Sequence, residues 1–256
     1  MYPVLIDFGA FRIYTYGVMI ALGLLVGIIL ATRRARREGI DANKILDTTF
    51  YALIAALLGS RLLFVLFYLE DYLDAPFRIL KLWEGGLVFY GGLIPAVIVG
   101  LWYITRSGLP IWQTADIFAP SIAIGHGLGR LGCFFAGCCY GKECNLPWAI
   151  TFTDPRGLGP LGVSVHPTQL YESLFLLCLF VFLVLLRRHK RFHGELLWIY
   201  VLSYSVGRFL IEFLRGDYRG PWTAGVISTT QVVALVSGGI SVAMLLYLRK
   251  KAERLS

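Results

Sequence analysis

The chain contains repeated apolar stretches of about 20 residues, which is the length of an α-helix that crosses the hydrocarbon core of a bilayer. Seven such segments can be counted, near residues 13–32, 46–68, 87–105, 114–137, 169–186, 196–214 and 226–248. They occupy most of the 256 residues and leave no room for a separate soluble domain. We therefore expect an all-α, polytopic membrane protein with about seven transmembrane helices, forming one transmembrane domain over residues 1–256.

The composition agrees with this class of protein. Hydrophobic residues make up 57% of the chain and charged residues only 16%, and the mean hydropathy is +0.68. The formal net charge of +8 is explained by basic runs beside the spans, which anionic lipid headgroups attract. We therefore do not expect nucleic acid as a partner. The first residues lack a basic stretch and include Asp7, so we expect no cleaved signal peptide.

Basic runs follow the first, fifth and seventh segments and indicate which loops are cytoplasmic. These runs cover residues 33–37, 187–191 and 249–254. The loops on the opposite side carry fewer lysines and arginines. This asymmetry predicts an N-terminus outside the cell and a cytoplasmic C-terminus.

The segment from residue 114 to residue 141 places an arginine at membrane depth. Arg130 lies in this otherwise apolar stretch, and burying an arginine there costs roughly 2.5–3.5 kcal/mol on insertion scales. Five glycines from Gly125 to Gly137 surround it and allow helices and backbone to approach closely. A charged residue buried at this cost indicates a function. The segment therefore predicts a cavity that Arg130 helps to line.

Three further arginines lie within or just after the predicted spans. Arg61 is inside the second span and Arg215 follows the sixth, while Arg208 is four residues before Glu212 and shares a helix face with it. Arg208 and Glu212 either neutralise each other or belong to a binding site. The excess of arginine over embedded carboxylate favours an anion, and a phospholipid phosphate suits guanidinium groups. Helix packing and headgroup binding remain equal alternatives for Arg61.

Polar residues also gather at the outer ends of the predicted spans. Tyr90 lies between two glycine pairs, His166 precedes the fifth span, and Tyr16 is near the start of the first. Each tyrosine alone is explained as an interface anchor, and His166 alone as a residue that satisfies a loop carbonyl. As a set, they converge on the face toward which Arg130 and Arg208 point, which indicates a site.

Four of the five cysteines follow the segment with Arg130 in the spacing C-x4-C-C-x4-C. Structural zinc sites use C-x2-C pairs, so this spacing does not predict a metal site. We expect instead a disulfide between Cys144 and Cys138 or Cys139 at an oxidising outer face. Cys178 lies in an apolar run and is expected to be a small buried hydrophobic residue.

Taken in order, these motifs resemble those of the bacterial prolipoprotein diacylglyceryl transferases along nearly the whole chain. The matching segments are YTYG, GSRLLFVLFY, WEGGLVFYGGL, GRLGCFFAGCCYG, HPTQLYE and YSVGRFLIEFLR. The resemblance implies a multi-pass enzyme of the bacterial cytoplasmic (inner) membrane, with its active site toward the outer face. It implies transfer of diacylglycerol from phosphatidylglycerol to the lipobox cysteine thiol of a preprolipoprotein signal peptide, without a cofactor.

The resemblance also implies roles for individual residues. It maps the essential signature arginine onto Arg130, a second headgroup arginine onto Arg208, and the helix partner of that arginine onto Glu212. It maps two functional tyrosines onto Tyr16 and Tyr204. The other expected substrate-binding positions are Arg61, Gly129, Gly132, Cys133, Cys138, Gly141 and Arg215.

Three positions depart from the family pattern. Tyr90 stands where the best-studied members have a histidine that is proposed to activate the acceptor thiol, while Cys133 replaces an asparagine and Cys138 a glutamate. A tyrosine with an ordinary pKa near 10 is a poor base. His166 or His126 is therefore expected to take the proton, with Tyr90 as the alternative.

These departures leave two other functions to consider. One is a relative of the same fold that acts on another acceptor, in which the cysteines carry their own thiol chemistry. The other is a phospholipid-binding or transport protein that uses the arginines as an anion site. Transporters commonly contain internal repeats, and the two halves of this chain are not similar.

Overall fold

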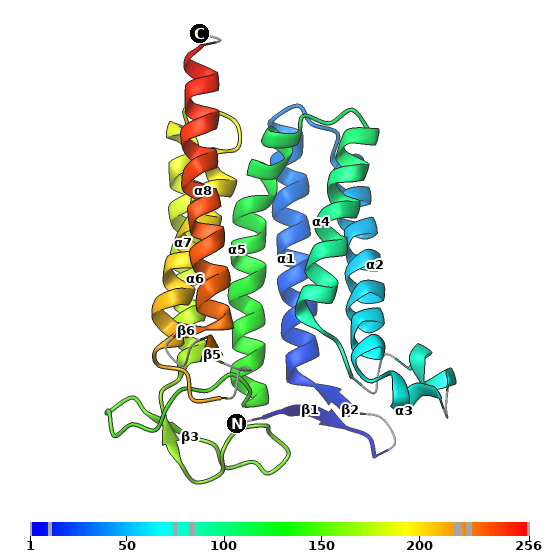
Figure 1. Cartoon of the computed structure of the whole chain (residues 1–256), viewed down its shortest axis with the longest axis vertical. Coiled ribbons are helices and arrows are strands. Elements are labelled where there is room, and N and C mark those ends of the chain that lie inside the picture. The colour runs from blue at the N-terminus through cyan, green and yellow to red at the C-terminus, as the bar shows by residue number, and fades with distance from the viewer. Residues whose placement is uncertain are drawn as a thin grey trace. The chain divides into compact units, whose positions relative to one another are not determined.

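The computed structural model describes residues 2–9, 12–73, 76–81, 85–217, 222–223 and 227–254. Most of the described chain is helical (Figure 1). It divides into two compact units, which we name by size. The large unit contains residues 1–30 and 115–256, and the small unit contains residues 31–114.

Seven of the described helices are long and three are short. Their bounds are α1 Thr15–Arg37, α2 Ala42–Phe67, α3 Leu69–Leu73, η1 Pro76–Leu80, α4 Phe89–Arg106, α5 Ile111–Ala136, α6 Thr168–Leu186, η3 Arg187–His189, α7 Glu195–Glu212 and α8 Thr229–Glu253. Short strands form three antiparallel pairs: β1 Val4–Asp7 with β2 Arg12–Tyr14, β3 Ile150–Thr151 with β4 Ser164–Val165, and β5 Trp222–Thr223 with β6 Ile227–Ser228.

Each of the seven apolar segments coincides with a long helix. Five of these helices, α1, α2, α4, α6 and α8, are long and apolar enough to cross a membrane. The other two are α5, which contains Arg130, and α7, which contains Arg208. The two helices that carry the predicted arginines are therefore the two that length and apolar composition do not identify as membrane spans.

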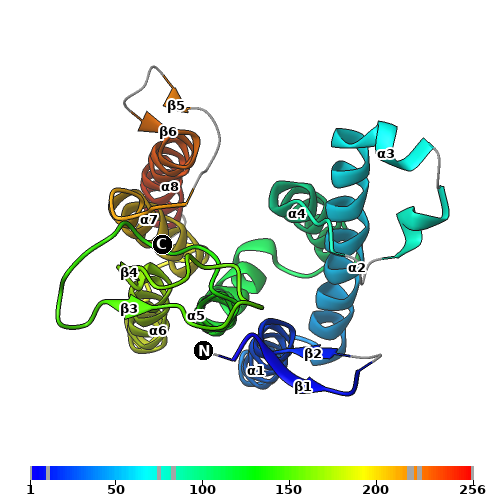
Figure 2. The ribbon, with the colours of Figure 1, turned by 90° about the horizontal axis from the view of Figure 1, so that it is seen from below.

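The core of the large unit lies among α5, α6 and α7, which stand side by side with α8 (Figure 2). Ala119 and Ala123 of α5 are fully buried against leucines of α6 and α7. The predicted close approach of helices also holds within this unit. A Cβ on Gly23 of α1 would lie 2.8 Å from the carbonyl oxygen of Gly125 in α5, so the two backbones touch where neither residue has a side chain.

In the small unit, α2 and α4 pack along their length. Their closest approach is at glycines, because a Cβ on Gly59 of α2 would collide with the carbonyl oxygen of Gly91 in α4. Pro95 of α4 fills the space beside Gly59. The first turn of α4, which contains Tyr90, is therefore fixed against α2.

A buried carboxylate joins α5 to the start of α7 in the large unit. Asp116 of α5 accepts hydrogen bonds from the backbone N–H groups of Gly194, Leu196 and Leu197, at 2.9, 2.9 and 3.2 Å. It also pairs with Lys190 Nζ at 3.3 Å. These N–H groups have no partner inside their own helix, so Asp116 caps α7 from a neighbouring helix and complements its dipole.

Candidate active site

Arg130 lies in the last third of α5 and forms an ion pair across to α6. Its Nη2 atom is 3.0 Å from Oε1 of Glu172, whose side chain is almost fully buried. The hydroxyl of Tyr204, on α7, donates to the same carboxylate oxygen at 3.0 Å. Three helices of the large unit therefore meet at one buried ion pair, and Glu172 fixes the position of the Arg130 guanidinium.

Arg208 lies on α7, and its ion pair with Glu212 follows the spacing that the sequence predicts. Arg208 Nη2 is 2.6 Å from Glu212 Oε2, and both side chains are buried. The other carboxylate oxygen of Glu212 accepts from the hydroxyl of Ser228, which caps α8, at 2.9 Å. Within the described part of the chain, the buried Nη1 of Arg208 has no hydrogen-bond partner. This arginine therefore keeps a donor that protein atoms do not use.

Arg215 follows α7 and is held by both its backbone and its side chain. It forms an isolated antiparallel β-bridge with Gly141, and its guanidinium makes two hydrogen bonds of 2.7 Å to the carboxylate of Asp217. Among the described residues, none accepts a hydrogen bond from its buried Nη1. Gly141 is required here, since a Cβ would lie 2.8 Å from the carbonyl oxygen of Leu214.

His126 is one turn before Arg130 on α5 and belongs to an aromatic cluster. Its Nδ1 is 3.3 Å from the hydroxyl of Tyr200, and its ring centroid is 4.8 Å from that of Tyr204. The rings of Tyr200 and Tyr204 are stacked at 6.2 Å with an angle of 9° between them. His126 is thus beside Tyr204, whose hydroxyl contacts the Glu172 partner of Arg130. From the sequence, His126 was only the second candidate for the base.

His166 immediately precedes the Pro167 that opens α6. Its Nδ1 is 3.3 Å from the hydroxyl of Tyr171, which accepts a hydrogen bond of 2.8 Å from Trp148 Nε1. The backbone of His166 also pairs with Gly141, whose N–H donates to its carbonyl at 3.0 Å. The ring therefore contacts a tyrosine hydroxyl rather than the loop carbonyl that the sequence offered as the alternative.

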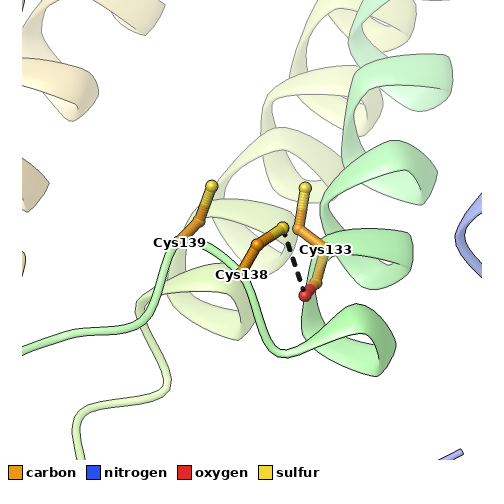
Figure 3. Close-up of side chains that lie close together, drawn as sticks. All are labelled: Cys133, Cys138 and Cys139. Atoms are coloured by element: carbon orange, nitrogen blue, oxygen red, sulfur yellow. Dashed lines mark hydrogen bonds between the residues drawn. The ribbon is translucent and has the colours of Figure 1, made fainter. Parts of the chain in front are cut away.

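Three of the cysteines come together at the end of α5. The sulfur atoms of Cys133, Cys138 and Cys139 all lie within 4.8 Å of one another, and Figure 3 shows the three side chains gathered there. The Cys138 thiol also donates to the carbonyl oxygen of Cys133 at 3.7 Å. The Cys133 thiol, together with Arg215 and Arg130, lowers the pKa of the Cys139 thiol, because each of them stabilises a thiolate. Contact with the two neighbouring thiols and burial raise the pKa of the Cys138 thiol.

Two predictions about cysteines are wrong in this structure. All five cysteines are free thiols, so Cys144 is not joined to Cys138 or Cys139. The chain turn after α5 brings Cys133, rather than Cys144, to that pair. Cys178 is exposed on α6 and not buried, because apolar residues of a membrane helix face lipid as readily as they face the protein interior.

The remaining expected positions in the large unit lie along the contact between α1 and α5. Tyr16 is in the first turn of α1, and a Cβ on Gly132 would lie 3.2 Å from its ring. A Cβ on Gly129 would lie 3.2 Å from the Cδ1 atom of Ile20. These glycines allow α1 to approach α5 beside Arg130, which agrees with the predicted glycine role.

Arg61 and Tyr90 belong to the small unit. The Arg61 guanidinium donates to backbone carbonyl oxygens before α4, and its three nitrogens all take part: Nε to Ile79 at 2.9 Å, Nη1 to Gly85 at 2.6 Å and Gly86 at 3.3 Å, and Nη2 to Arg78 at 2.5 Å. It also contacts the rings of Phe64 and Tyr72. Tyr90 is 42% exposed, and its ring packs edge-on against Phe89.

The sequence did not identify Glu172 as the partner of Arg130 or Asp217 as the partner of Arg215. Both pairings join residues that are not at helical spacing, unlike Arg208 and Glu212. One signal was available, because Glu172 is a carboxylate inside an apolar helix, and such a group needs a buried cation.

Comparisons with known proteins identify the family of this chain. Residues 3–247 match the family model described as prolipoprotein diacylglyceryl transferase. The chain is 37% identical to the phosphatidylglycerol–prolipoprotein diacylglyceryl transferase of Clostridium tetani, over 92% of this chain and 93% of that protein. It is also 37% identical to the Bacillus cereus protein of the same name, over 98% and 93% of the two chains. A protein named phosphatidylglycerol–prolipoprotein diacylglyceryl transferase 2, from Clostridium perfringens, is 32% identical over 90% and 89%.

These matches cover nearly the whole chain, and they include the segments that position Arg130, Arg208 and Glu172. The apolar helices and the family together indicate a multi-pass membrane protein. This chain therefore belongs to the prolipoprotein diacylglyceryl transferase family, and it is a diacylglyceryl transferase.

Proposed function

We propose that the enzyme transfers the diacylglyceryl group of phosphatidylglycerol to the lipobox cysteine thiol of preprolipoproteins. A thioether forms and glycerol phosphate leaves. The names of the relatives support both substrates. The observation that carries the proposal is the unused donor of Arg208, because a buried guanidinium N–H without a protein partner is suited to a phosphate oxygen.

The site has the charge that a phosphate leaving group requires. Negative charge increases on the departing phosphate in the transition state, and buried guanidinium groups stabilise it more strongly than they would in water. Arg130 and Arg208 fulfil this role in the proposal, with Arg215 nearby. Glu172 and Glu212 hold the first two guanidinium groups in place through their ion pairs.

Other residues contribute to substrate binding in the proposal. Tyr204 supports Glu172 through its hydroxyl, and Tyr16 packs beside Gly132. The glycines that line the site let a lipid headgroup approach the backbone. These are the signature positions Gly129, Gly132 and Gly141, with Cys133 and Cys138.

Arg61 is better explained by packing than by headgroup binding. All three of its guanidinium nitrogens donate to backbone carbonyls of the segment before α4. A guanidinium used in this way has little capacity left for a phosphate. We therefore propose that Arg61 positions the start of α4 and with it Tyr90.

The proton of the acceptor thiol is assigned to Tyr90 and His166 as alternatives. His166 carries an imidazole ring whose Nδ1 is 3.3 Å from the Tyr171 hydroxyl. Tyr90 is exposed enough to meet a substrate. The substitutions described in the Discussion separate the two.

We also propose that α5 and α7 cross the membrane together with the five apolar helices, so that the chain forms one seven-span transmembrane domain. The polar residues of α5 and α7 support this, since they pair within the large unit instead of facing lipid. The basic runs support an N-terminus outside the cell and a C-terminus in the cytoplasm. The active site then faces the outer side of the bacterial inner membrane.

Complementation of a bacterial strain depleted of its own transferase tests the function. Growth, together with a reporter lipoprotein whose lipobox cysteine carries diacylglycerol by mass spectrometry, is the expected result. The Arg208→Ala variant at equal membrane abundance is the matched control and should fail. An abundant wild-type protein that leaves the reporter unmodified would overturn the proposal.

Topology is tested by thiol labelling of intact cells with a reagent that does not cross the membrane. The test uses Arg36→Cys in a chain whose native cysteines are replaced by serine. We expect residue 36 to react only after the cells are permeabilised. Labelling of this residue in intact cells would contradict the proposed orientation.

A further inference from the structure

We propose that Cys133, Cys138 and Cys139 bind a zinc ion, and that this ion takes the acceptor cysteine thiol as its fourth ligand. The first part concerns only this chain. The second part rests on the proposed function, because it requires a thiol substrate at the same site.

The geometry of the three sulfur atoms carries the first part. They lie within 4.8 Å of one another, and zinc–sulfur bonds of about 2.3 Å in a tetrahedral site place sulfur atoms about 3.8 Å apart. A contraction of about 1 Å or less is therefore enough to form the site. Cys133 is fixed on α5, while Cys138 and Cys139 are in the loop that follows (Figure 3).

The loop is held in the shape that the site needs. Gln169 Nε2 donates to the carbonyl of Cys138 and Thr168 Oγ1 to that of Cys139, each at 2.8 Å from the start of α6. Cys139 has a backbone φ of 67°, a left-handed conformation that is uncommon for residues other than glycine. A conformation of this kind persists only where the surroundings enforce it, and it often accompanies a functional site.

The charge around the cluster favours bound thiolates. Three thiolates and one Zn²⁺ carry a net charge of −1, and Arg130 and Arg215 both act electrostatically on Cys139. Arg130 is three residues before Cys133 and on the same face of α5. The two guanidinium groups would destabilise a bare cation, but they stabilise an anionic zinc–thiolate complex.

The C-x4-C-C spacing gave no reason to expect this site, because structural zinc sites are recognised by C-x2-C loops. Here the turn after α5 brings Cys138 and Cys139 close to Cys133 with a C-x4-C-C spacing. Three protein ligands, as found here, are typical of catalytic zinc, whereas structural zinc has four. Cys144 does not belong to the group of neighbouring sulfur atoms identified among the described residues.

The fourth position explains how the acceptor thiol is activated. Zinc held by these three thiolates would lower the pKa of an acceptor thiol bound in the fourth position. The thiol would then give its proton to the proposed base, His166 or Tyr90. A sulfur lone pair then forms the C–S bond to the glyceryl carbon, and the C–O bond to phosphate breaks with its electron pair on the phosphate oxygen. The neutral thioether product would be a weak ligand, so it would not hold the fourth position. No oxidant or reductant is needed.

This role fits the departure at Tyr90. A free thiol with a pKa of about 8.5 is only about 3% ionised at pH 7. Coordination to zinc raises the ionised fraction by up to roughly 30-fold at that pH. A zinc site would therefore lower the strength that a base needs in a chain without a histidine at position 90.

Metal content tests the first part without any measurement of activity. The full-length protein, purified in detergent with a mild reductant, should contain about one zinc per chain by elemental analysis. Exchange with Co²⁺ should give the intense near-ultraviolet absorption of thiolate–cobalt bonds. Cys138→Ser and Cys139→Ser should lose both signals, whereas Cys144→Ser and Cys178→Ser should keep them. Equal metal content in all four variants, or a disulfide among the three cysteines, would overturn the site.

Transfer assays with chelator-treated protein test the second part. At pH 7 the metal-free enzyme should be at least tenfold slower, zinc should restore it, and the difference should shrink as the pH rises toward 9, where free thiols ionise. Bound zinc with equal rates before and after chelation would overturn thiol activation while leaving the metal site. A zinc-containing protein that transfers nothing under any condition would instead contradict the proposed function.

Discussion

Arg61 and Arg208 are both buried helical arginines, 4% and 6% exposed, but their guanidinium groups have different hydrogen-bond partners. Every guanidinium nitrogen of Arg61 donates to a backbone carbonyl of the small unit. Arg208 has one carboxylate partner, Glu212, and a buried Nη1 without a partner among the described residues. Burial of a charge therefore does not identify a site, whereas an unused donor does.

The energetics support this distinction. Leaving a buried donor unsatisfied costs about 1–3 kcal/mol, which a ligand can offset when it binds. Arg61 carries no such cost, so its position is explained by folding alone. Substitution of Arg208 should therefore lower the transfer rate more than the stability, whereas substitution of Arg61 should lower the stability more than the transfer rate.

The largest effect is expected for Arg208→Ala and Arg130→Ala, which should each reduce transfer at least roughly 100-fold. Loss of one charge-assisted contact to phosphate costs about 1.5–3 kcal/mol, and more where the contact strengthens in the transition state. Turnover of phosphatidylglycerol with a lipobox peptide, at equal membrane abundance, measures this.

Lysine substitutions provide the control for these two positions. Arg208→Lys and Arg130→Lys keep the charge but lose the planar fork, so they should recover little activity. Wild-type turnover in either alanine variant would show that the substituted arginine does not bind the headgroup. The proposed contrast between a binding arginine, Arg208, and a packing arginine, Arg61, would then be wrong.

The second effect is on stability. Arg61→Met should lower the free energy of unfolding by about 3 kcal/mol, because several buried carbonyl oxygens lose their donor. Thermal unfolding in detergent measures this, and the folded fraction should keep near wild-type specific activity. A variant as stable as wild type but inactive would show that Arg61 binds substrate.

A smaller effect is expected for Glu172→Gln, which keeps the shape of the side chain but removes its charge. Arg130 and the Tyr204 hydroxyl share one oxygen of Glu172, so the guanidinium should lose its fixed position. We expect an approximately tenfold lower transfer rate, equal to about 1.4 kcal/mol. Tyr204→Phe should add little to it, because both act through the same group. A double variant with fully additive losses would contradict this shared role.

The smallest effect is expected for Tyr90→Phe, in the small unit. It should slow transfer by only a few-fold, since an external thiol already ionises appreciably toward pH 8.5. Tyr90→His should stay active and shift the pH profile downward, because an imidazole titrates near neutrality. If Tyr90→Phe matches wild type across the pH range and His166→Ala is inactive, Tyr90 only packs and His166 is the base.

The positions of the long helices were predictable because hydropathy over 20 residues is a strong local signal. The predicted segments near 169–186 and 196–214 differ from α6 and α7 by at most two residues at each end. Hydropathy does not report which buried polar groups pair, so the partners of Arg130 and Asp116 did not follow from it. The ion pair of Arg208 and Glu212 did, because it lies at helical spacing.

The cysteines show where spacing arguments fail. The interval between Cys133 and Cys138 contains a helix end and a turn, and these bring the sulfur atoms together over a distance that motif spacing does not encode. The left-handed backbone conformation of Cys139 was likewise not predictable, because the sequence has no glycine at that position. Local backbone geometry therefore determines which thiols lie together, whereas the sequence predicted that Cys144 would pair with Cys138 or Cys139.

The cap that Asp116 places on α7 constrains how the protein is made. The ribosome synthesises Asp116 78 residues before Gly194, the first of its amide partners. At roughly 5–20 residues per second, about 4–16 s pass between the synthesis of Asp116 and that of Gly194. During this time the Asp116 carboxylate has no amide partner from α7. α7 can therefore be capped in this way only after α5, α6 and the residues between them have been made.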